Sequence, residues 1–247
     1  MSEQAWGAGC VAVVTGASSG IGKATAERLA ADGLTVMGVG RDGAALGPGG
    51  FVMDVTSAGG PAAIVAEARR RHRRIDVLVN AAGVIASAGL KETTDDAFDA
   101  MLDVNLRASF RLMREATSSL VATRGSVVNL SSVAGTRAFP GLLSYCVSKA
   151  AVDQLTRCAA LDLAANGVRV NAVNPGVVVT NLHRRGGMDE ARYAAFLEHS
   201  KATHPLGRPG TADEIAELIV WLASPRASWI TGETISIDGG RHLTCLR

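Results

Sequence analysis

The sequence predicts an α/β fold, a doubly wound parallel sheet of about seven strands with helices on both faces. Short apolar runs without polar alternation, which are typical of strands buried on both faces, alternate with longer stretches of helical period. No linker, low-complexity segment or change of composition divides the chain, so residues 1–247 are expected to form a single domain. Right-handed crossovers in such a sheet place a ligand crevice at the carboxyl ends of the strands.

The expected elements follow one another along the whole chain. Strands are predicted at 10–15, 34–40, 50–53, 75–79, 126–130, 168–173 and 234–237. Helices are predicted over about 12 residues from Gly20, and then at 61–71, 95–121, 143–165 and 213–222. The connection 181–209 shows no clear strand or helix signal, and its recognition-capable side chains suit either a substrate flap or a pair of surface helices.

Composition and charge argue against several classes of function. A net charge of +2 is too small to indicate a polyanionic partner. The basic run 69–74 is interpreted as a helix end, because nothing extends it into a basic face, and no nucleic-acid partner is expected. The four cysteines lack metal-ligand spacing, so no metal site is expected. With no signal-peptide pattern and no apolar run of about 18 residues, we expect no membrane association and a cytoplasmic location.

A glycine-rich segment joins the first strand to the first helix. This glycine turn, residues 15–22, reads Thr-Gly-Ala-Ser-Ser-Gly-Ile-Gly. Glycines there permit positive φ and let backbone N–H groups approach a diphosphate at the helix N-terminus. The spacing G-x-x-x-G-x-G differs from the Rossmann pattern G-x-G-x-x-G, so a tight turn without a ligand also stays open. The turn favours a Rossmann-like dinucleotide site.

Two other motifs overlap the glycine turn. Residues 16–20 match G-x-S-x-G, the nucleophile elbow of α/β-hydrolases, with Ser18 as the nucleophile. That elbow would lie on the first strand, which leaves no room for the sheet that precedes it in those enzymes. A P-loop would need glycine at Ala17 and a hydroxyl residue at Ala24. Both alternatives are weaker than the dinucleotide interpretation.

Tyr145 and Lys149 are the predicted centre of the chemistry. Lying four residues apart in a helical stretch, they project from one face within about 5–6 Å of each other. Lowering the pKa of a phenol from about 10 to neutrality requires roughly 4 kcal/mol. One ammonium about 4 Å away supplies that much at an effective dielectric constant near 20. The pair can therefore serve as a general acid–base, although its spacing alone is common on helices.

Further motifs occur in a fixed order around this pair. They are the glycine turn, Asn-Ala-Ala-Gly at 80–83, Asp-Val-Asn at 103–105, Ser-Ser at 131–132, Asn-Pro-Gly at 174–176 and Asp-Gly-Gly at 238–240. With them the chain resembles the short-chain dehydrogenase/reductase family, in its short single-domain branch, from the first strand to the last. Within that family it is most similar to the 3-oxoacyl-carrier-protein reductases.

The resemblance implies a role for each catalytic residue. Tyr145 exchanges a proton with the substrate oxygen, which Ser132 holds. Lys149 lowers the pKa of Tyr145 and binds the nicotinamide ribose. Asn105 binds a water that links Lys149 to solvent. The expected catalytic residues are Asn105, Ser132, Tyr145 and Lys149; as alternatives, Asn105 and Ser132 would be turn or cap residues.

The resemblance also implies a cofactor site along the strand ends. The expected cofactor-binding residues are Gly16, Ala17, Ser18, Ser19, Gly20, Ile21, Gly22, Arg41, Asp54, Val55, Asn80, Ala81, Ala82, Gly83, Tyr145, Lys149, Pro175, Gly176, Val178 and Thr180. Segment 80–83 would support the sheet and contact the adenosine side, and Asp54 would bind adenine or simply cap the next helix. Segment 175–180 would lie against the nicotinamide, unless Thr180 is only a helix cap.

The end of the second strand bears on the choice of cofactor. An acidic residue there binds the ribose hydroxyl of NAD, whereas a nearby arginine accommodates the 2′-phosphate of NADP. Gly40 stands where the acid would be, and Arg41 follows it. A guanidinium fits a phosphate, so we expect NADP over NAD. Asp42 leaves NAD open, since it would pair with Arg41 or lie beside the ribose.

The expected function is that of an NAD(P)-dependent oxidoreductase which interconverts a ketone and a secondary alcohol. The resemblance implies a small-molecule substrate, such as a 3-oxoacyl thioester or a related carbonyl compound, and a homotetramer. Arg137, Arg184 and Arg185 are candidates for binding a carboxylate or phosphate of the substrate. The alternative is a non-catalytic dinucleotide-binding sensor, which would not require the four catalytic residues.

Overall fold

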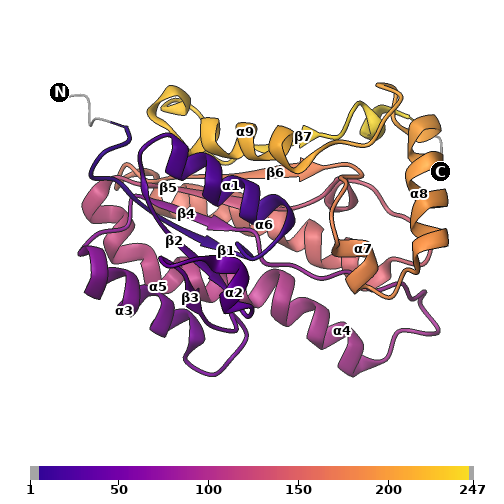
Figure 1. Ribbon diagram of the computed structural model, residues 1–247, viewed down its shortest axis with the longest axis horizontal. Helices are drawn as coiled ribbons and strands as arrows, with labels where there is room; N and C mark the ends of the chain where they lie inside the picture. The colour runs from indigo at the N-terminus through magenta and orange to yellow at the C-terminus, as the bar shows by residue number, and fades with distance from the viewer. Residues whose placement is uncertain (1–5, 245–247) are drawn as a thin grey trace.

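A seven-stranded parallel sheet forms the centre of the computed structural model, which describes residues 6–244 (Figure 1). The strands are β1 (Val11–Thr15), β2 (Thr35–Gly40), β3 (Phe51–Val52), β4 (Val77–Asn80), β5 (Ser126–Leu130), β6 (Arg169–Pro175) and β7 (Thr234–Ile237). They lie in the order β3-β2-β1-β4-β5-β6-β7, with every neighbouring pair parallel. The strand order reverses between β1 and β4, so the crevice of a doubly wound sheet lies at their carboxyl ends. The predicted fold class is confirmed.

Helices cover both faces of the sheet (Figure 1). One face packs against α1 (Gly20–Ala31) and α9 (Ala212–Ala223). The other packs against α3 (Gly60–His72), α5 (Ala108–Thr123) and α6 (Leu143–Ala164). The shorter helices are α2 (Gly43–Leu46), α4 (Asp95–Leu102), α7 (Leu182–Arg185) and α8 (Glu190–Thr203), with 3-10 turns η2 (Val133–Gly135), η3 (Pro225–Ala227) and η4 (Arg241–Leu243). None of the helices in residues 6–244 is long and apolar enough to cross a bilayer.

The central strands are apolar throughout because both of their faces are buried. In β1, Ala12 and Val14 belong to the core shared with α1 and α9, whereas Val13 belongs to the core shared with α3 and α5. All three side chains are at most 1% exposed. Fully burying a valine contributes on the order of 1.5–3 kcal/mol. The continuous apolar pattern of the sequence therefore reflects two cores, one on each side of the sheet.

The segment predicted as one helix at 95–121 is more complex. Helix α4 runs into a π-helical turn, η1 (Asp103–Arg107), and the chain then continues as α5 to Thr123. The residues on either side of η1 keep right-handed helical dihedral angles, so the helix is widened rather than broken. Such a turn inserts an extra residue into the helical repeat, and apolar periodicity alone does not detect it.

The connection 181–209 contains two helices, α7 and α8, as one of the two alternatives had it. The buried residues of α8 are Tyr193, Ser200 and Thr203, and two of these three are polar. An amphipathic helix is detected from a stripe of apolar residues, which α8 lacks. The basic run occupies the last turn of α3 as predicted, and Arg70 and Arg71 there pair with Glu67 at 2.7 and 2.6 Å.

Candidate functional site

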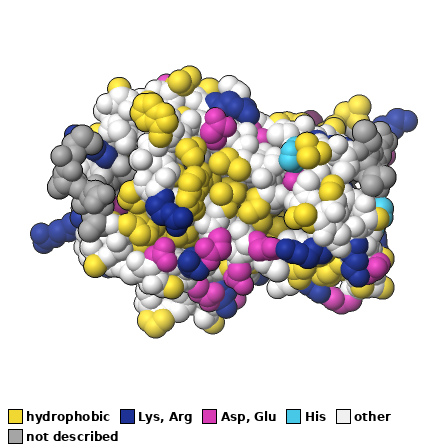
Figure 2. Space-filling model, turned by 90° about the horizontal axis from the view of Figure 1, so that it is seen from above, with side chains coloured by type: hydrophobic (Ala, Val, Ile, Leu, Met, Phe, Trp, Pro, Cys, Tyr) yellow, Lys and Arg dark blue, Asp and Glu magenta, His cyan; other side chains and the backbone are white. Residues whose placement is uncertain are grey.

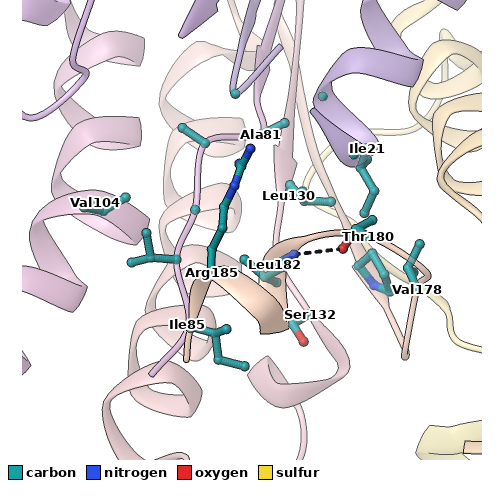
Figure 3. A pocket seen from close by; sticks show the side chains of 18 of the residues that line it. Ile21, Ala81, Ile85, Val104, Leu130, Ser132, Val178, Thr180, Leu182 and Arg185 are labelled. Carbon is teal, nitrogen blue, oxygen red and sulfur yellow. Dashed lines mark hydrogen bonds between the residues drawn. The ribbon is translucent and has the colours of Figure 1, made fainter. Parts of the chain in front are cut away.

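A pocket of about 620 Å³ opens at the carboxyl ends of the strands. Its walls come from the glycine turn, the ends of β2 and β3, the segment after β4, and parts of η2, α6 and the chain after β6 (Figure 3). Predicted cofactor residues that line it are Gly16, Ser18, Ser19, Gly20, Ile21, Gly22, Arg41, Asp54, Val55, Ala81, Ala82, Gly83, Pro175, Gly176, Val178 and Thr180. Ser132, Tyr145 and Lys149 line it as well. Ala17, Asn80 and Asn105 do not.

The glycine turn lies against the segment that follows β4. Gly16 has a φ of +68°, and a Cβ there would lie 2.7 Å from the carbonyl oxygen of Ala81. Helix α1 begins at Gly20, which lines the pocket, and the Ser19 side chain makes no capping hydrogen bond. A helix N-terminus with free N–H groups attracts anions. The turn can therefore accept the diphosphate of a dinucleotide. A side chain at Gly16 would collide with Ala81 and disrupt the turn.

Hydrogen bonds join the glycine turn to the segment that follows β4. Thr15 Oγ1 accepts the backbone N–H groups of Ala81 and Ala82 at 3.1 and 3.2 Å. Asn80 Nδ2 donates to Asn129 Oδ1 at 2.8 Å, so it links β4 to β5. Asn80 is 3% exposed. It was predicted among the cofactor residues, but its side chain supports the sheet beneath the pocket.

Tyr145 and Lys149 both come from the first turns of α6. The Nζ atom of Lys149 lies 5.8 Å from the centroid of the Tyr145 ring and donates to the carbonyl oxygen of Leu130 at 2.7 Å. The two residues are 7% and 4% exposed. Ser132 precedes η2, where its hydroxyl accepts the N–H of Ala134 at 3.1 Å, and it also hydrogen-bonds Tyr145. A phenol, an amine and a hydroxyl therefore meet at one wall of the pocket.

Burial determines the protonation of this pair. It raises the pKa of Tyr145 to about 12, against the opposing effect of the hydrogen bond with Ser132. It lowers the pKa of Lys149 to about 8, which the nearby charge of Asp153 opposes. This differs from the expectation that the pKa of Tyr145 lies below its ordinary value, because burial disfavours the charged phenolate. The structure thus presents Tyr145 as a neutral phenol that can donate a proton.

Asn105 lies in the π-helical turn and is 2% exposed. Its Oδ1 accepts the N–H of Val84 at 2.9 Å, and its Nδ2 donates to the Val84 carbonyl at 3.0 Å and to Ser148 Oγ at 3.0 Å. A Cβ at Gly83 would lie 3.3 Å from Asn105 Oδ1 and 3.7 Å from Lys149 Nζ. The glycine therefore keeps a space between the amide and the amine, and Asn105 fixes the chain that forms its wall.

Arg41 lies at the rim of the pocket with its side chain 75% exposed, and its Nη1 atom is 3.9 Å from Asp54 Oδ2. The other oxygen of Asp54 accepts the N–H and hydroxyl of Thr56, at 2.9 and 2.7 Å, and these bonds lower the pKa of the carboxyl. A Cβ at Gly40 would lie 3.2 Å from Ser18 Oγ. The end of β2 thus has little room for an acidic side chain, and a guanidinium stands beside it.

The neighbouring arginines of α7 point in different directions. Arg185 Nη1 donates to Ser19 Oγ at 2.8 Å, so this side chain extends from α7 across the pocket to the glycine turn (Figure 3). Arg184 instead pairs with Glu190 at 2.5 Å and lies over the Tyr193 ring, 3.9 Å from its centroid. Of the two, Arg185 lines the pocket and Arg184 does not.

The pocket lining also contains residues that no sequence motif identified: Ile85, Phe139, Leu142 and Arg241. They come from three separate segments. Leu182 and Phe196 line the pocket too, and they lie in the connection 181–209, for which a substrate flap was one of the two expectations. Arg137, a candidate for binding an anion, lies outside the lining, and its Nη1 donates to the backbone oxygen of Arg241 at 2.6 Å.

Comparison with known proteins gives consistent matches over nearly the whole chain. A family model described as enoyl-(acyl carrier protein) reductase matches residues 16–242. A 3-oxoacyl-[acyl-carrier-protein] reductase of Thermotoga maritima is 37% identical over 94% of this chain and 97% of its own length. The short-chain reductase protein NovJ of Streptomyces niveus is 40% identical over 94% of this chain and 93% of its own length. The crystal structure of a short-chain dehydrogenase/reductase of unknown function from Caenorhabditis elegans, solved with cofactor, superimposes with a TM-score of 0.90 at 34% identity, covering 96% of each chain.

Proposed function

The chain belongs to the short-chain dehydrogenase/reductase family, and from this premise we propose that Tyr145, Ser132, Lys149 and Asn105 carry its reaction. It is an NAD(P)-dependent oxidoreductase that interconverts a ketone and a secondary alcohol. The observation that carries the assignment of residues is the buried phenol of Tyr145, hydrogen-bonded to Ser132 in the pocket that also contains the glycine turn.

In the proposed reduction, the bound cofactor supplies a hydride to the carbonyl carbon of the substrate. Ser132 and Tyr145 hold the carbonyl oxygen, and Tyr145 transfers its proton to that oxygen as negative charge develops there. The adjacent amine of Lys149 favours the transient phenolate. Asn105 keeps the segment after β4 in place and leaves the space at Gly83 open for a water that would return the proton to Tyr145 through Lys149.

We propose NADP as the preferred cofactor. Arg41 at the rim can pair with a 2′-phosphate, and it stands beside a strand end that has no acidic residue to repel one. Arg185, already oriented toward Ser19, adds a second cation at the phosphate end of the site. The other predicted cofactor residues that line the pocket are proposed to bind the cofactor, and Asp54 also fixes Thr56. Asn80 is proposed to support them from below.

We further propose a cytoplasmic homotetramer that reduces a small carbonyl compound such as a 3-oxoacyl thioester. The relative from Thermotoga maritima is named for a 3-oxoacyl substrate. An assembly is supported by the edge strand β7, whose four residues are all partly exposed, and by partly buried Leu218 and Trp221 on α9. Hydrophobic side chains gather in the middle of the face above α9 and β7 in Figure 2. No nucleic-acid or membrane partner is proposed.

Residues 181–209 are proposed as a flap over the substrate. Leu182, Arg185 and Phe196 of this segment line the pocket, and the ion pair Arg184–Glu190 joins α7 to α8 within it. Tyr193 anchors the segment, since its hydroxyl donates to the Thr180 carbonyl at 2.9 Å. Opening it would expose the pocket without breaking the sheet.

The test is oxidation of NADPH and NADH with a panel of β-keto esters, diketones, sugars and steroids. With the best substrate, Tyr145→Phe should lower kcat by about 10²–10⁴-fold while retaining cofactor affinity. The chain has two tyrosines, so Tyr193→Phe is the matched control and should change kcat by less than about ten-fold. Tight cofactor binding without turnover of any compound would instead support the sensor.

A further inference from the structure

A buried cation lines the pocket beside Phe139. Arg241 lies in η4, lines the pocket and is 8% exposed. Within residues 6–244, its guanidinium hydrogen-bonds Thr203 Oγ1 and forms no ion pair. A guanidinium carries five N–H donors, and a buried charge is costly unless it is paired. The hydroxyl of Thr203 is a neutral partner and does not compensate that charge.

The nearest acidic side chain is already engaged. Asp238 accepts the backbone N–H groups of Gly240 and His242 at 3.1 and 2.7 Å, and it pairs with His242 Nδ1 at 3.0 Å. Burial lowers the pKa of Arg241, the charge of Arg137 acts in the same direction, and Asp238 opposes them. The surroundings of Arg241 thus leave a positive charge that favours an anion.

Arg137 lies close to the same place. Its guanidinium carbon is 5.9 Å from the centroid of the Phe139 ring, and that of Arg241 is 5.1 Å from it. Phe139 also packs against the apolar cluster that includes Tyr145. The buried cation thus lies beside a ring of the apolar cluster to which Tyr145 belongs, and all three residues line the same pocket, as a small molecule with two functional groups would require.

The other arginines and the lysine that line the pocket already have partners. Arg41 stands near Asp54, Arg185 reaches Ser19, and Lys149 donates to the Leu130 carbonyl. The phosphates of the cofactor are assigned to the glycine turn. Arg241 therefore remains for a charge on the substrate itself.

We propose that Arg241 binds a carboxylate on the substrate, so that this enzyme acts on oxo acids or the corresponding hydroxy acids. A guanidinium binds a carboxylate through two parallel hydrogen bonds, which fixes its orientation as well as its position. The carbonyl group would then lie at Tyr145, with the connecting carbons along Phe139 and Leu142. This inference rests on the proposed function, because it names the substrate class for the same pocket.

The experiment compares three oxo acids with their methyl esters: 3-oxobutanoate, 4-oxopentanoate and 5-oxohexanoate. The series varies the distance between carbonyl and carboxylate. For the member that fits, wild-type kcat/KM should be at least about ten-fold higher for the acid than for the ester. Arg241→Met should bring this ratio to about one by lowering the value for the acid alone, and Arg241→Lys should retain part of it. Arg184→Ala, which removes a cation outside the pocket, should leave the ratio unchanged.

The outcomes separate this inference from the proposed function. Turnover of the esters with no preference for any acid would overturn the carboxylate site and leave the oxidoreductase intact. An equal loss for acid and ester in Arg241→Met would also overturn it, because it would show a structural role. If that variant does not fold, the wild-type ratio decides, and Thr203→Val, which keeps the guanidinium, should retain the preference.

Absence of turnover with all six compounds and with the wider panel, with either cofactor, would contradict the proposed function. Binding then tests the carboxylate site by itself. 4-Oxopentanoate should raise the Tm of the wild-type protein and not that of Arg241→Met. Equal shifts in the two proteins, or no shift in either, would overturn the site.

Discussion

The glycine turn and the flap face each other across the pocket, but they are held in place by different forces. The turn is fixed by buried, neutral hydrogen bonds, such as those from Ala81 and Ala82 to Thr15. The flap is anchored on its inner side by Tyr193, and on its outer side the exposed pair Arg208–Glu214 joins it to α9. Exposed ion pairs contribute about 0–1 kcal/mol each and weaken in salt, whereas an unsatisfied buried group costs about 1–3 kcal/mol.

This difference separates binding from release. A rigid turn holds the cofactor in one position, which hydride transfer requires. A weakly held flap can open for substrate and product at little energetic cost. We therefore expect changes in the buried part to act on folding and on pH dependence, and changes in the flap to act on affinity and salt dependence.

The largest expected effect is on the pH dependence of the free energy of unfolding, and it comes from Lys149. The folded pKa of Lys149, about 8, lies below its ordinary value of 10.5, so the unfolded chain binds more protons between these pH values. Stability should therefore rise with pH in this window, by about 3 kcal/mol in full. The raised pKa of Tyr145 opposes this above pH 10, where the unfolded phenol loses its proton first. Urea unfolding at pH 7 and pH 9.5 should show the rise in the wild-type protein and not in Lys149→Met; parallel curves would contradict it.

Thr15→Val tests the neutral network directly. The substitution keeps the shape of the side chain but removes the acceptor for two N–H groups, so the free energy of unfolding should fall by about 2 kcal/mol. Thr15→Ser keeps the acceptor oxygen and should retain most of the wild-type stability. The measurement is denaturant unfolding, with Arg184→Ala as the flap counterpart, expected to change stability by less than about 0.5 kcal/mol. A larger effect at Arg184 than at Thr15 would reverse the comparison.

Arg41→Ala tests the outer rim of the cofactor site. Loss of the guanidinium should lower kcat/KM for NADPH by about ten-fold and leave that for NADH nearly unchanged, because only the former carries a 2′-phosphate. Steady-state kinetics with both cofactors measures the ratio. A wild-type preference for NADH that Arg41→Ala leaves unchanged would refute the NADP proposal.

Arg185→Ala has the smallest expected effect and tests the contact between the two regions. Losing its bond to Ser19 should raise the KM for the cofactor by about three-fold, and high salt should produce a similar rise in the wild-type protein. Arg184→Ala is the matched control and should leave the cofactor KM unchanged. Equal effects of the two substitutions would show that the flap acts through its overall charge.

The sequence predicted the cofactor side of the molecule because its signals are local. Glycine spacing, strand ends and the four-residue separation of Tyr145 and Lys149 are all visible within short segments. Burial of that pair is not, since it depends on how α6 packs, and for this reason the rise that burial causes in the pKa of Tyr145 was not predicted.

The substrate side required the folded chain. Phe139 and Arg241 are about 100 residues apart and meet only through packing. Arg184 and Arg185 look equivalent in sequence, but the direction of α7 sends one to Glu190 and the other to Ser19. Tertiary placement, rather than residue type, decides which of these cations enters the pocket.

The π-helical turn that contains Asn105 also limits how this protein can be redesigned. A redesign that regularises the helix by substitutions alone, so that Asp103–Arg107 adopts α-helical geometry with no residue removed, would rotate the preceding turns by about 100° relative to α5, because the wider turn no longer absorbs the extra residue. Asn105 would then face away from Val84, and the wall between the fourth strand and Lys149 would lose its support. A change that improves helix geometry, and that scales of residue propensity would favour, is therefore expected to damage the site it lies beside. Inherited irregularities of this kind are better kept as fixed points when the scaffold is adapted to new substrates.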